Sequence, residues 1–253
     1  MPFFEVPGPS STGLRLAYEV QGSGPPIVLV HGFASNRGTN WRSPSWYRTL
    51  SEAGRQVIAL DVRGHGESDK PHDAAAYDEA ELASDVVRLL DHLSIARADV
   101  MGYSMGGFIL LRVLAEQPQR LNKAIIAGVG ENYYRRTSAN GDKIAEGLRV
   151  PTSRDVMDAV ARQFRVFAEQ GKNDLEALAL CMLRPRVTIN SFPDNGVPVL
   201  IVVGATDSIA GDARVLAEHV PNARLVIVPG RDHMLTVGDK AYKDAVISFL
   251  NEA

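Results

Sequence analysis

The sequence is poor in cysteine, in charge of one sign and in long apolar runs, and each shortage excludes a class of protein. Cys181 is the only cysteine among the 253 residues, so neither an intramolecular disulfide nor a cysteine-based zinc site can form. The net charge is −3 without any basic block, which argues against nucleic acid or an anionic membrane as a partner. No apolar run approaches the roughly 20 residues that a membrane-spanning helix needs.

The opening segment MPFFEVPGPSSTG also lacks the basic stretch and apolar core of a signal peptide. We therefore expect a cytoplasmic protein with no membrane partner. Hydrophobic residues make up 45% of the chain and charged residues 23%, which is an ordinary globular balance. A chain of this length can form one large domain, or a domain with an insert.

Short apolar runs alternate with helical patterns along most of the chain. Residues 14–20 alternate apolar and polar side chains, as a half-buried strand does. Continuous apolar runs predict strands buried on both faces at residues 27–31, 56–61, 98–103, 123–129, 198–204 and 223–230. Helical periodicity occupies residues 78–93, 105–117, 211–220 and 240–253. This alternation predicts an α/β fold with a mostly parallel sheet covered by helices on both faces.

The alternation stops between residues 130 and 196, where the sequence has no convincing buried strand. Helical patterns cover residues 153–170 and 173–183 instead, and Asn173 with Glu176 is a candidate capping pair for the second. Asp78 with Glu81 is a similar candidate for the helix at 78–93. We expect a core domain formed by residues 1–129 and 197–253, and a helical cap formed by residues 130–196 above the strand ends.

Ser104 lies in the stretch GYSMGG, between a predicted strand and a predicted helix. A G-x-S-x-G sequence in that context forces a sharp turn that presents the serine hydroxyl above the carboxyl edge of the sheet. Glycine suits positions 102 and 106, because side chains there would collide with the neighbouring strand and helix. The alternative is a packing turn with an incidental serine. We interpret Ser104 as a nucleophile, which then requires a base and an orienting carboxylate.

His233 is the predicted base, because its loop follows the last predicted strand and lies at the same sheet edge as Ser104. His31 ends a strand and is built into a turn, and His65 lies in the loop RGHGES. The remaining histidines are interpreted as solvated surface residues: His72, His92 and His219.

Asp207 is the predicted acid, because it leaves the strand at 198–204 at its carboxyl end. Asp232 adjoins His233, and adjacent residues rarely face each other well enough to orient a ring. Asp61 is expected to brace its own loop, and Asp194 and Asp212 remain weaker alternatives. Two backbone N–H groups, those of Phe33 and Met105, are predicted to form an oxyanion hole.

Five motifs together resemble the α/β-hydrolase superfamily, and they appear in that family's order from residue 31 to residue 233. They are HGF at 31–33, DVRGHGES at 61–68, GYSMGG at 102–107, GATD at 204–207 and RDH at 231–233. Within the superfamily the chain is similar to small serine esterases with a short helical cap. One departure is Ser208, since many relatives have a proline or an apolar residue after this aspartate.

The resemblance implies a carboxylic ester hydrolase that acts on a small-molecule ester without a metal or an organic cofactor. Similar motifs occur in C–C bond hydrolases, enol-lactone hydrolases and cofactor-free perhydrolases, which remain alternatives. A non-catalytic ligand receptor built on the same fold is a further alternative. A serine nucleophile favours acyl chemistry over the alkyl chemistry of the dehalogenase and epoxide hydrolase branches.

The cap is expected to shape the substrate pocket, although the sequence does not single out a binding side chain. Candidate lining residues are Tyr133, Tyr134, Phe164, Phe167 and Met182. For Phe164 and Phe167, which share one predicted helix, packing inside the cap is the preferred interpretation. Three arginines could receive an anionic substrate, but a solvated face is preferred for each: Arg135, Arg136 and Arg149.

Overall fold

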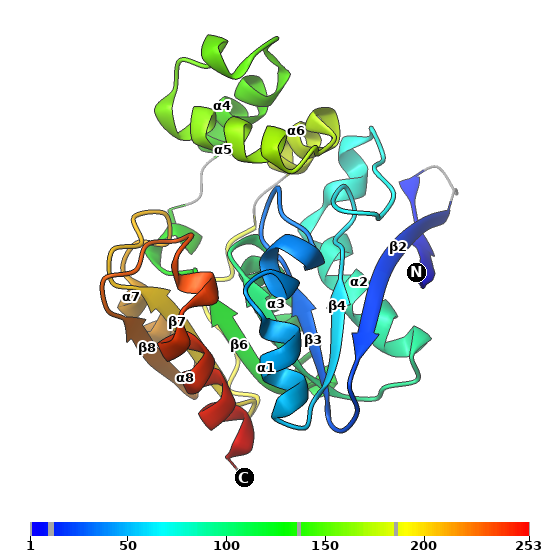
Figure 1. Ribbon diagram of the computed structural model, residues 1–253, viewed down its shortest axis with the longest axis vertical. Coiled ribbons are helices and arrows are strands. Elements are labelled where there is room, and N and C mark those ends of the chain that lie inside the picture. The colour runs from blue at the N-terminus through cyan, green and yellow to red at the C-terminus, as the bar shows by residue number, and fades with distance from the viewer. Residues whose placement is uncertain (1, 10–12, 136–137, 185–186, 253) are drawn as a thin grey trace.

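A mixed sheet of eight strands forms the centre of the computed structural model, which describes residues 2–9, 13–135, 138–184 and 187–252 (Figure 1). The strand order is β1 (Phe3–Pro7), β2 (Gly13–Gln21), β4 (Gln56–Leu60), β3 (Pro26–Val30), β5 (Ala98–Tyr103), β6 (Leu121–Ala127), β7 (Val199–Gly204) and β8 (Ala223–Val228). The pairs β1–β2 and β2–β4 are antiparallel, and all others are parallel. The predicted α/β fold with a mostly parallel sheet is therefore confirmed.

Every strand predicted from the sequence is present. The prediction of burial on both faces is wrong for β8, which is the edge strand of the sheet and has partly exposed side chains. β1 is an additional strand that the pattern did not indicate. Its sequence, FFEVP, is short and ends in proline, so its pattern by itself is a weak strand signal. Pairing with β2 stabilises it, because Phe4 lies opposite Leu16 and Val6 lies opposite Leu14. The side chains of Phe4 and Val6 are both buried in the core.

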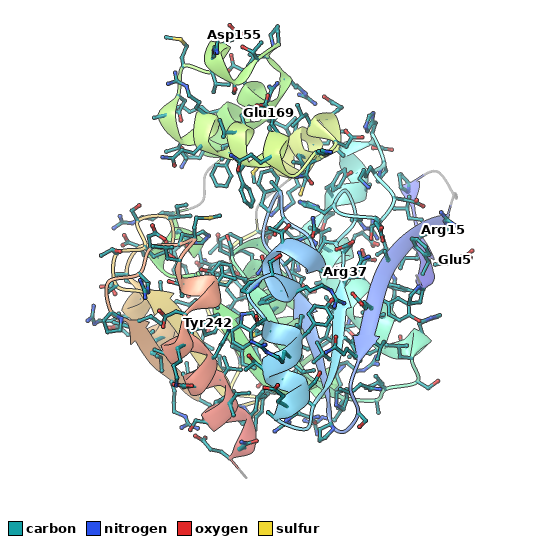
Figure 2. All side chains as sticks on the ribbon, in the orientation of Figure 1. Glu5, Arg15, Arg37, Asp155, Glu169 and Tyr242 are labelled. Atoms are coloured by element: carbon teal, nitrogen blue, oxygen red, sulfur yellow. The ribbon has the colours of Figure 1, made fainter. Side chains whose placement is uncertain are left out.

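Helices cover both faces of the sheet. One face is packed by α2 (Glu79–His92), α3 (Met105–Glu116) and α7 (Ala213–His219), and the other by α1 (Trp46–Glu52) and α8 (Lys240–Asn251). Tyr242 of α8, labelled in Figure 2, is fully buried. Its ring centroid lies 4.7 Å from that of Trp46 of α1. The sequence analysis did not identify α1, a short helix that is stabilised by this aromatic packing.

Three helices lie in the interval 130–196: α4 (Ser138–Arg149), α5 (Ala159–Gln170) and α6 (Leu175–Leu183). Figure 1 shows them together above the edge of the sheet. The sequence analysis missed α4, because its Asn-Gly pair and Gly147 are turn signals. Ile144 and Leu148 are nevertheless buried, so packing against the other two helices outweighs the weak local propensity.

The caps of two helices test the sequence predictions directly. Asp78 is the N-cap of α2, as predicted, and its carboxylate accepts a hydrogen bond from Ala80 N at 2.7 Å. The predicted cap of α6 is wrong, because Asp174 rather than Asn173 accepts from Ala177 N, at 3.0 Å. None of the helices in the described part of the chain is both long and apolar enough to span a membrane.

Candidate active site

Ser104 occupies a strained turn between β5 and α3, with φ 53° and ψ −112°. A non-glycine residue rarely adopts this conformation, so the surrounding backbone must enforce it. A Cβ atom at Gly102 would lie 2.2 Å from the Gly106 carbonyl oxygen, and one at Gly106 would lie 2.0 Å from the Val30 carbonyl oxygen. Both glycines therefore permit close backbone approach, as the sequence pattern predicts. Gly107 has a similar reason, since its Cβ would lie 2.6 Å from Val129.

Asp207 and His233, 26 positions apart in the chain, meet at the same sheet edge. His233 Nδ1 lies 2.8 Å from Asp207 Oδ2, and the aspartate side chain is fully buried. The other carboxylate oxygen accepts hydrogen bonds from the N–H groups of Ile209 and Ala210, at 3.0 and 2.8 Å. These contacts hold the carboxylate in place, so it can fix the ring with Nε2 available as a base.

The ring of His233 packs beside the residue that precedes Ser104. Its centroid is 5.4 Å from that of the Tyr103 ring, and Tyr103 Oη donates to the His233 carbonyl oxygen at 2.5 Å. Gly128, with φ 65°, packs closely against both rings. A Cβ atom at this position would lie 3.1 Å from each of them. In the described part of the chain no hydrogen bond joins Ser104 Oγ to His233. Such bonds are often long in unliganded enzymes and shorten when substrate binds.

The loop after β3 lies directly beside Ser104. A Cβ at Gly32 would be 3.4 Å from Ser104 Cβ, and Asn40 Oδ1 holds the loop by accepting from Gly32 N at 3.0 Å. The N–H groups of Phe33, in this loop, and of Met105, at the first turn of α3, donate to no described residue. Two such donors beside a nucleophile are the arrangement that an oxyanion requires.

Other histidines are engaged elsewhere. His31 Nδ1 donates to the Gly32 carbonyl and its Nε2 accepts from Val62 N, while burial lowers its pKa, so the ring is a neutral structural part of the turn. Burial, followed by the charge of His31, lowers the pKa of His65 to about 3. The three histidines interpreted as surface residues are exposed, which confirms that prediction: His72, His92 and His219.

The rival carboxylates are also engaged elsewhere. Asp61 accepts from the N–H groups of Arg37 and Glu67 and therefore braces its loop, as predicted. Asp232 accepts from the backbone of its own turn at Met234 N, and Asp212 caps α7. Asp194 accepts from Gly196 N and from the side chain of Asn222.

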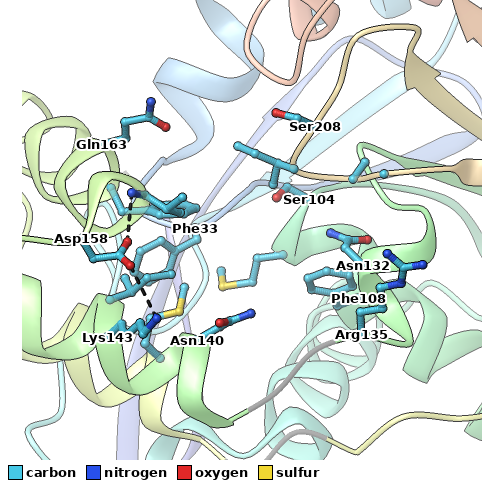
Figure 3. Close-up of a pocket in the computed structure, with 18 of the residues that line it drawn as sticks. Phe33, Ser104, Phe108, Asn132, Arg135, Asn140, Lys143, Asp158, Gln163 and Ser208 are labelled. Atoms are coloured by element: carbon cyan, nitrogen blue, oxygen red, sulfur yellow. Dashed lines mark hydrogen bonds and ion pairs between the residues drawn. The ribbon is translucent and has the colours of Figure 1, made fainter.

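A cavity of about 490 Å³ opens above Ser104, and side chains of α4, α5 and α6, which are together called the cap below, line one side of it (Figure 3). Phe164 and Met182 line it, and the Phe164 ring packs edge-on against Phe33 at 5.7 Å. The preference for packing inside the cap was therefore wrong for Phe164. Two candidate lining residues, Tyr133 and Tyr134, do not line this cavity. Phe167 does not line it either, which agrees with the preference stated for it. Ser208, the departure from the family pattern, does line it (Figure 3).

Charged side chains also line the cavity. Arg135 pairs with Glu131 at 3.0 Å, and Lys143 pairs with Asp158 at 3.7 Å on the cap side (Figure 3). Arg184 lines the cavity too, and the sequence analysis missed it because no motif marks this position.

For the arginines considered for anion binding, a solvated face was the preferred prediction, and the side chains of Arg135 and Arg149 are exposed. Arg149 pairs with Glu176 at 2.5 Å on the exposed cap surface, and Arg136 lies outside the described residues. Across the described chain, no group of three or more histidine, cysteine or acidic side chains is arranged to hold a metal ion.

Comparisons with known proteins identify similar sequences and structures. A family model described as alpha/beta hydrolase fold matches residues 25–146. The acetyltransferase component of an acetoin cleaving system from Pseudomonas putida is 32% identical over 91% of this chain, which spans 65% of that protein's length.

Two solved structures match nearly the whole chain. A hydrolase from Pseudomonas aeruginosa superposes with a TM-score of 0.80 at 24% identity, covering 99% of this chain and 98% of the other. An esterase from Exiguobacterium antarcticum gives a TM-score of 0.78 at 23% identity, covering 98% and 99%. At these identities the likeness establishes the fold.

Proposed function

Since the chain belongs to the α/β-hydrolase superfamily, we propose that it is a serine hydrolase that cleaves carboxylic esters through an acyl-enzyme. The observation that carries this proposal is the buried hydrogen bond of 2.8 Å between His233 and Asp207. In acyl transfer, a buried carboxylate fixes the orientation and tautomer of the histidine that removes the proton of the serine. The esterase among the similar structures agrees with the proposal at the level of the fold.

In the first half-reaction, His233 Nε2 takes the proton of Ser104 as Oγ attacks the acyl carbon. The N–H groups of Phe33 and Met105 hold the resulting oxyanion. His233 then gives the proton to the leaving alkoxide, and an alcohol departs. Asp207 stabilises the imidazolium that exists between these transfers.

In the second half-reaction, water enters and His233 takes one of its protons. The hydroxide attacks the acyl carbon of the ester on Ser104, and the same N–H groups hold the second oxyanion. His233 returns the proton to Ser104 Oγ, and the carboxylic acid leaves. Neither half-reaction requires a metal or an organic cofactor.

Replacement of the serine tests the proposal. Ser104→Ala should lower kcat/KM for a short p-nitrophenyl ester by at least about 10³-fold, because alanine has no hydroxyl to attack the acyl carbon. Ser248→Ala is the matched control, since Ser248 is exposed on α8. A fluorophosphonate probe should label the native chain and the control but not Ser104→Ala. Activity of Ser104→Ala close to that of the native chain would refute the assignment.

A substrate panel separates the proposal from its rivals. We expect simple esters to be cleaved faster than enol-lactones or dienones, because the proposed triad and oxyanion donors are sufficient for ester cleavage. Faster cleavage of an enol-lactone or a dienone would favour the alternative activities, which use the same serine. Absence of both labelling and turnover would favour a non-catalytic receptor.

A further inference from the structure

Arg184 is a buried cation in the wall of the cavity that contains Ser104. It follows α6 directly, and its side chain is only 2% exposed. Nη1 donates to the carbonyl oxygen and to Sγ of Cys181. Nε is buried without an acceptor, and the hydrogen bonds of Arg184 to described residues all come from Nη1, so Nη2 is unused. A guanidinium with unused donors at a cavity wall is suited to an anion.

The countercharge of Arg184 is incomplete. Glu79 Oε1 lies 3.6 Å from Nε, which is an ion pair but not a hydrogen bond. Burying a charge is costly unless hydrogen bonds satisfy it, so this site gains from an additional acceptor. Two further cations among the described residues line the cavity, Arg135 and Lys143. Their side chains are 75% and 60% exposed and pair with acids of the same cavity. Water and these partners already compensate their charge.

Arg184 also lies close to the residues around Ser104. Cys181 Sγ, which Nη1 contacts, is 3.9 Å from Met105 Sδ. Burial is the largest cause that lowers the pKa of His65, and Arg184 is among the charges that lower it further. The His65 ring in turn packs edge-on against Phe33 at 5.8 Å. The guanidinium is thus linked to the Met105 side chain through Cys181, and its charge reaches the His65 ring that packs against Phe33.

We propose that Arg184 forms a carboxylate-binding subsite, and that the substrate is an ester that carries a free carboxylate. This inference rests on the proposed ester hydrolysis. Nη2, which has no partner among the described residues, donates to one carboxylate oxygen, and the charge of the guanidinium attracts the carboxylate as a whole. Arg184 takes no part in proton transfer. It selects the substrate and holds its far end while Ser104 attacks the ester carbonyl.

Matched ester pairs test the subsite on either side of the ester bond. The acyl pair is mono-p-nitrophenyl glutarate against p-nitrophenyl pentanoate, and the alcohol pair is 4-carboxyphenyl butyrate against 4-methylphenyl butyrate. The measured quantity is the ratio of kcat/KM for the charged ester to that for the neutral ester. Arg184→Gln should lower this ratio about 10- to 100-fold in one pair, which identifies the side that carries the carboxylate.

Control variants separate a specific subsite from general damage. Arg149→Gln removes an exposed arginine of the cap and should leave both ratios unchanged. Arg184→Lys keeps the charge but loses the planar guanidinium with its Nη2 donor, so its ratio should fall between those of the native chain and Arg184→Gln. Ratios that do not change in Arg184→Gln, or that change equally in Arg149→Gln, would overturn the subsite.

Direct binding gives an answer that does not depend on turnover. Calorimetry with glutarate on Ser104→Ala should show binding that weakens at least about 10-fold when Arg184→Lys is added. Equal affinity in the two variants would overturn the subsite even if Arg184→Gln fails to fold. Failure of the subsite with normal cleavage of neutral esters leaves the proposed function intact. Glutarate binding without any ester cleavage keeps the subsite and removes the proposed function.

Discussion

Tyr103 connects the proposed nucleophile with the proposed base. It precedes Ser104 in the chain, and its hydroxyl donates to the carbonyl oxygen of His233 at 2.5 Å. Burial and then the charge of Asp207 raise the pKa of the phenol well above its usual value, so the group stays a neutral donor. We expect Tyr103 to act as a positioning residue that keeps the His233 loop in register with the turn at Ser104.

Tyr103→Phe should lower kcat for a neutral p-nitrophenyl ester about 2- to 12-fold with little change in KM, since one buried hydrogen bond contributes about 0.5–1.5 kcal/mol. Tyr242→Phe is a matched control, because the buried Tyr242 hydroxyl has no partner among the described residues. Its removal should leave kcat unchanged and leave the melting temperature unchanged or higher. Equal loss of kcat in both variants would contradict a positioning role for Tyr103.

At the scale of elements, the cap and the loop after β3 are joined by Asn173. Its Nδ2 donates to the carbonyl oxygen of Ala34 at 2.9 Å and to that of Ala168 at 3.2 Å. Ala34 follows Phe33 and has φ 56°, so this hydrogen bond helps to hold an unfavourable conformation. The sequence pattern suggested a helix cap for Asn173, whereas the folded chain uses it to connect two elements.

Asn173→Ala should lower kcat for a neutral p-nitrophenyl ester about 2- to 10-fold, because the loop that carries the Phe33 N–H becomes less ordered. Asn195→Ala serves as the comparison, since Asn195 Nδ2 donates to the Leu114 carbonyl outside the cavity. Both variants should lose some thermal stability, but only Asn173→Ala should lose kcat. A matching loss of kcat in the two variants would argue against this link.

The elements themselves were predictable wherever their signal is local. The strands buried on both faces appear as continuous apolar runs, and β5 matches its predicted range of 98–103. The missed elements, β1, α1 and α4, have weak local patterns and depend on partners far away in the chain. Phe4 in β1, for example, is buried because Leu16 and Tyr18 of β2 pack beside it.

For the whole molecule, two buried histidines couple stability to pH. Burial lowers the pKa of both His31 and His65, in the latter to about 3. Below about pH 6.5 the unfolded chain binds protons at these rings and the folded chain does not. The contribution of these two rings to folding stability is therefore fully present above about pH 6.5. Below that pH the free energy of unfolding decreases by at most about 1.4 kcal/mol per pH unit for each ring.

Urea unfolding at about pH 7.5, 6.5 and 5.5 should show this decrease in the free energy of unfolding, with a smaller slope in His65→Gln. His92→Gln removes an exposed histidine and should keep the original slope. Burial raises the pKa of Asp85 and Asp99, so these carboxyl groups increase the free energy of unfolding as the pH falls toward their range. The slopes of the three proteins are therefore compared above about pH 5. Identical slopes in all three proteins would contradict the role of His65.

The sequence by itself determined the alternation of strands β2 to β8 with most of the helices, the strained turn at Ser104 and the choice of Asp207 and His233 as its predicted partners. These features depend on short-range patterns: apolar runs, glycine spacing, and residues that leave strands at one edge of a parallel sheet. Only the tertiary structure decided which cap residues line the cavity, that Asn173 joins two elements, and that Arg184 is buried with unused donors. These features depend on contacts between segments far apart in the chain, which no local pattern encodes.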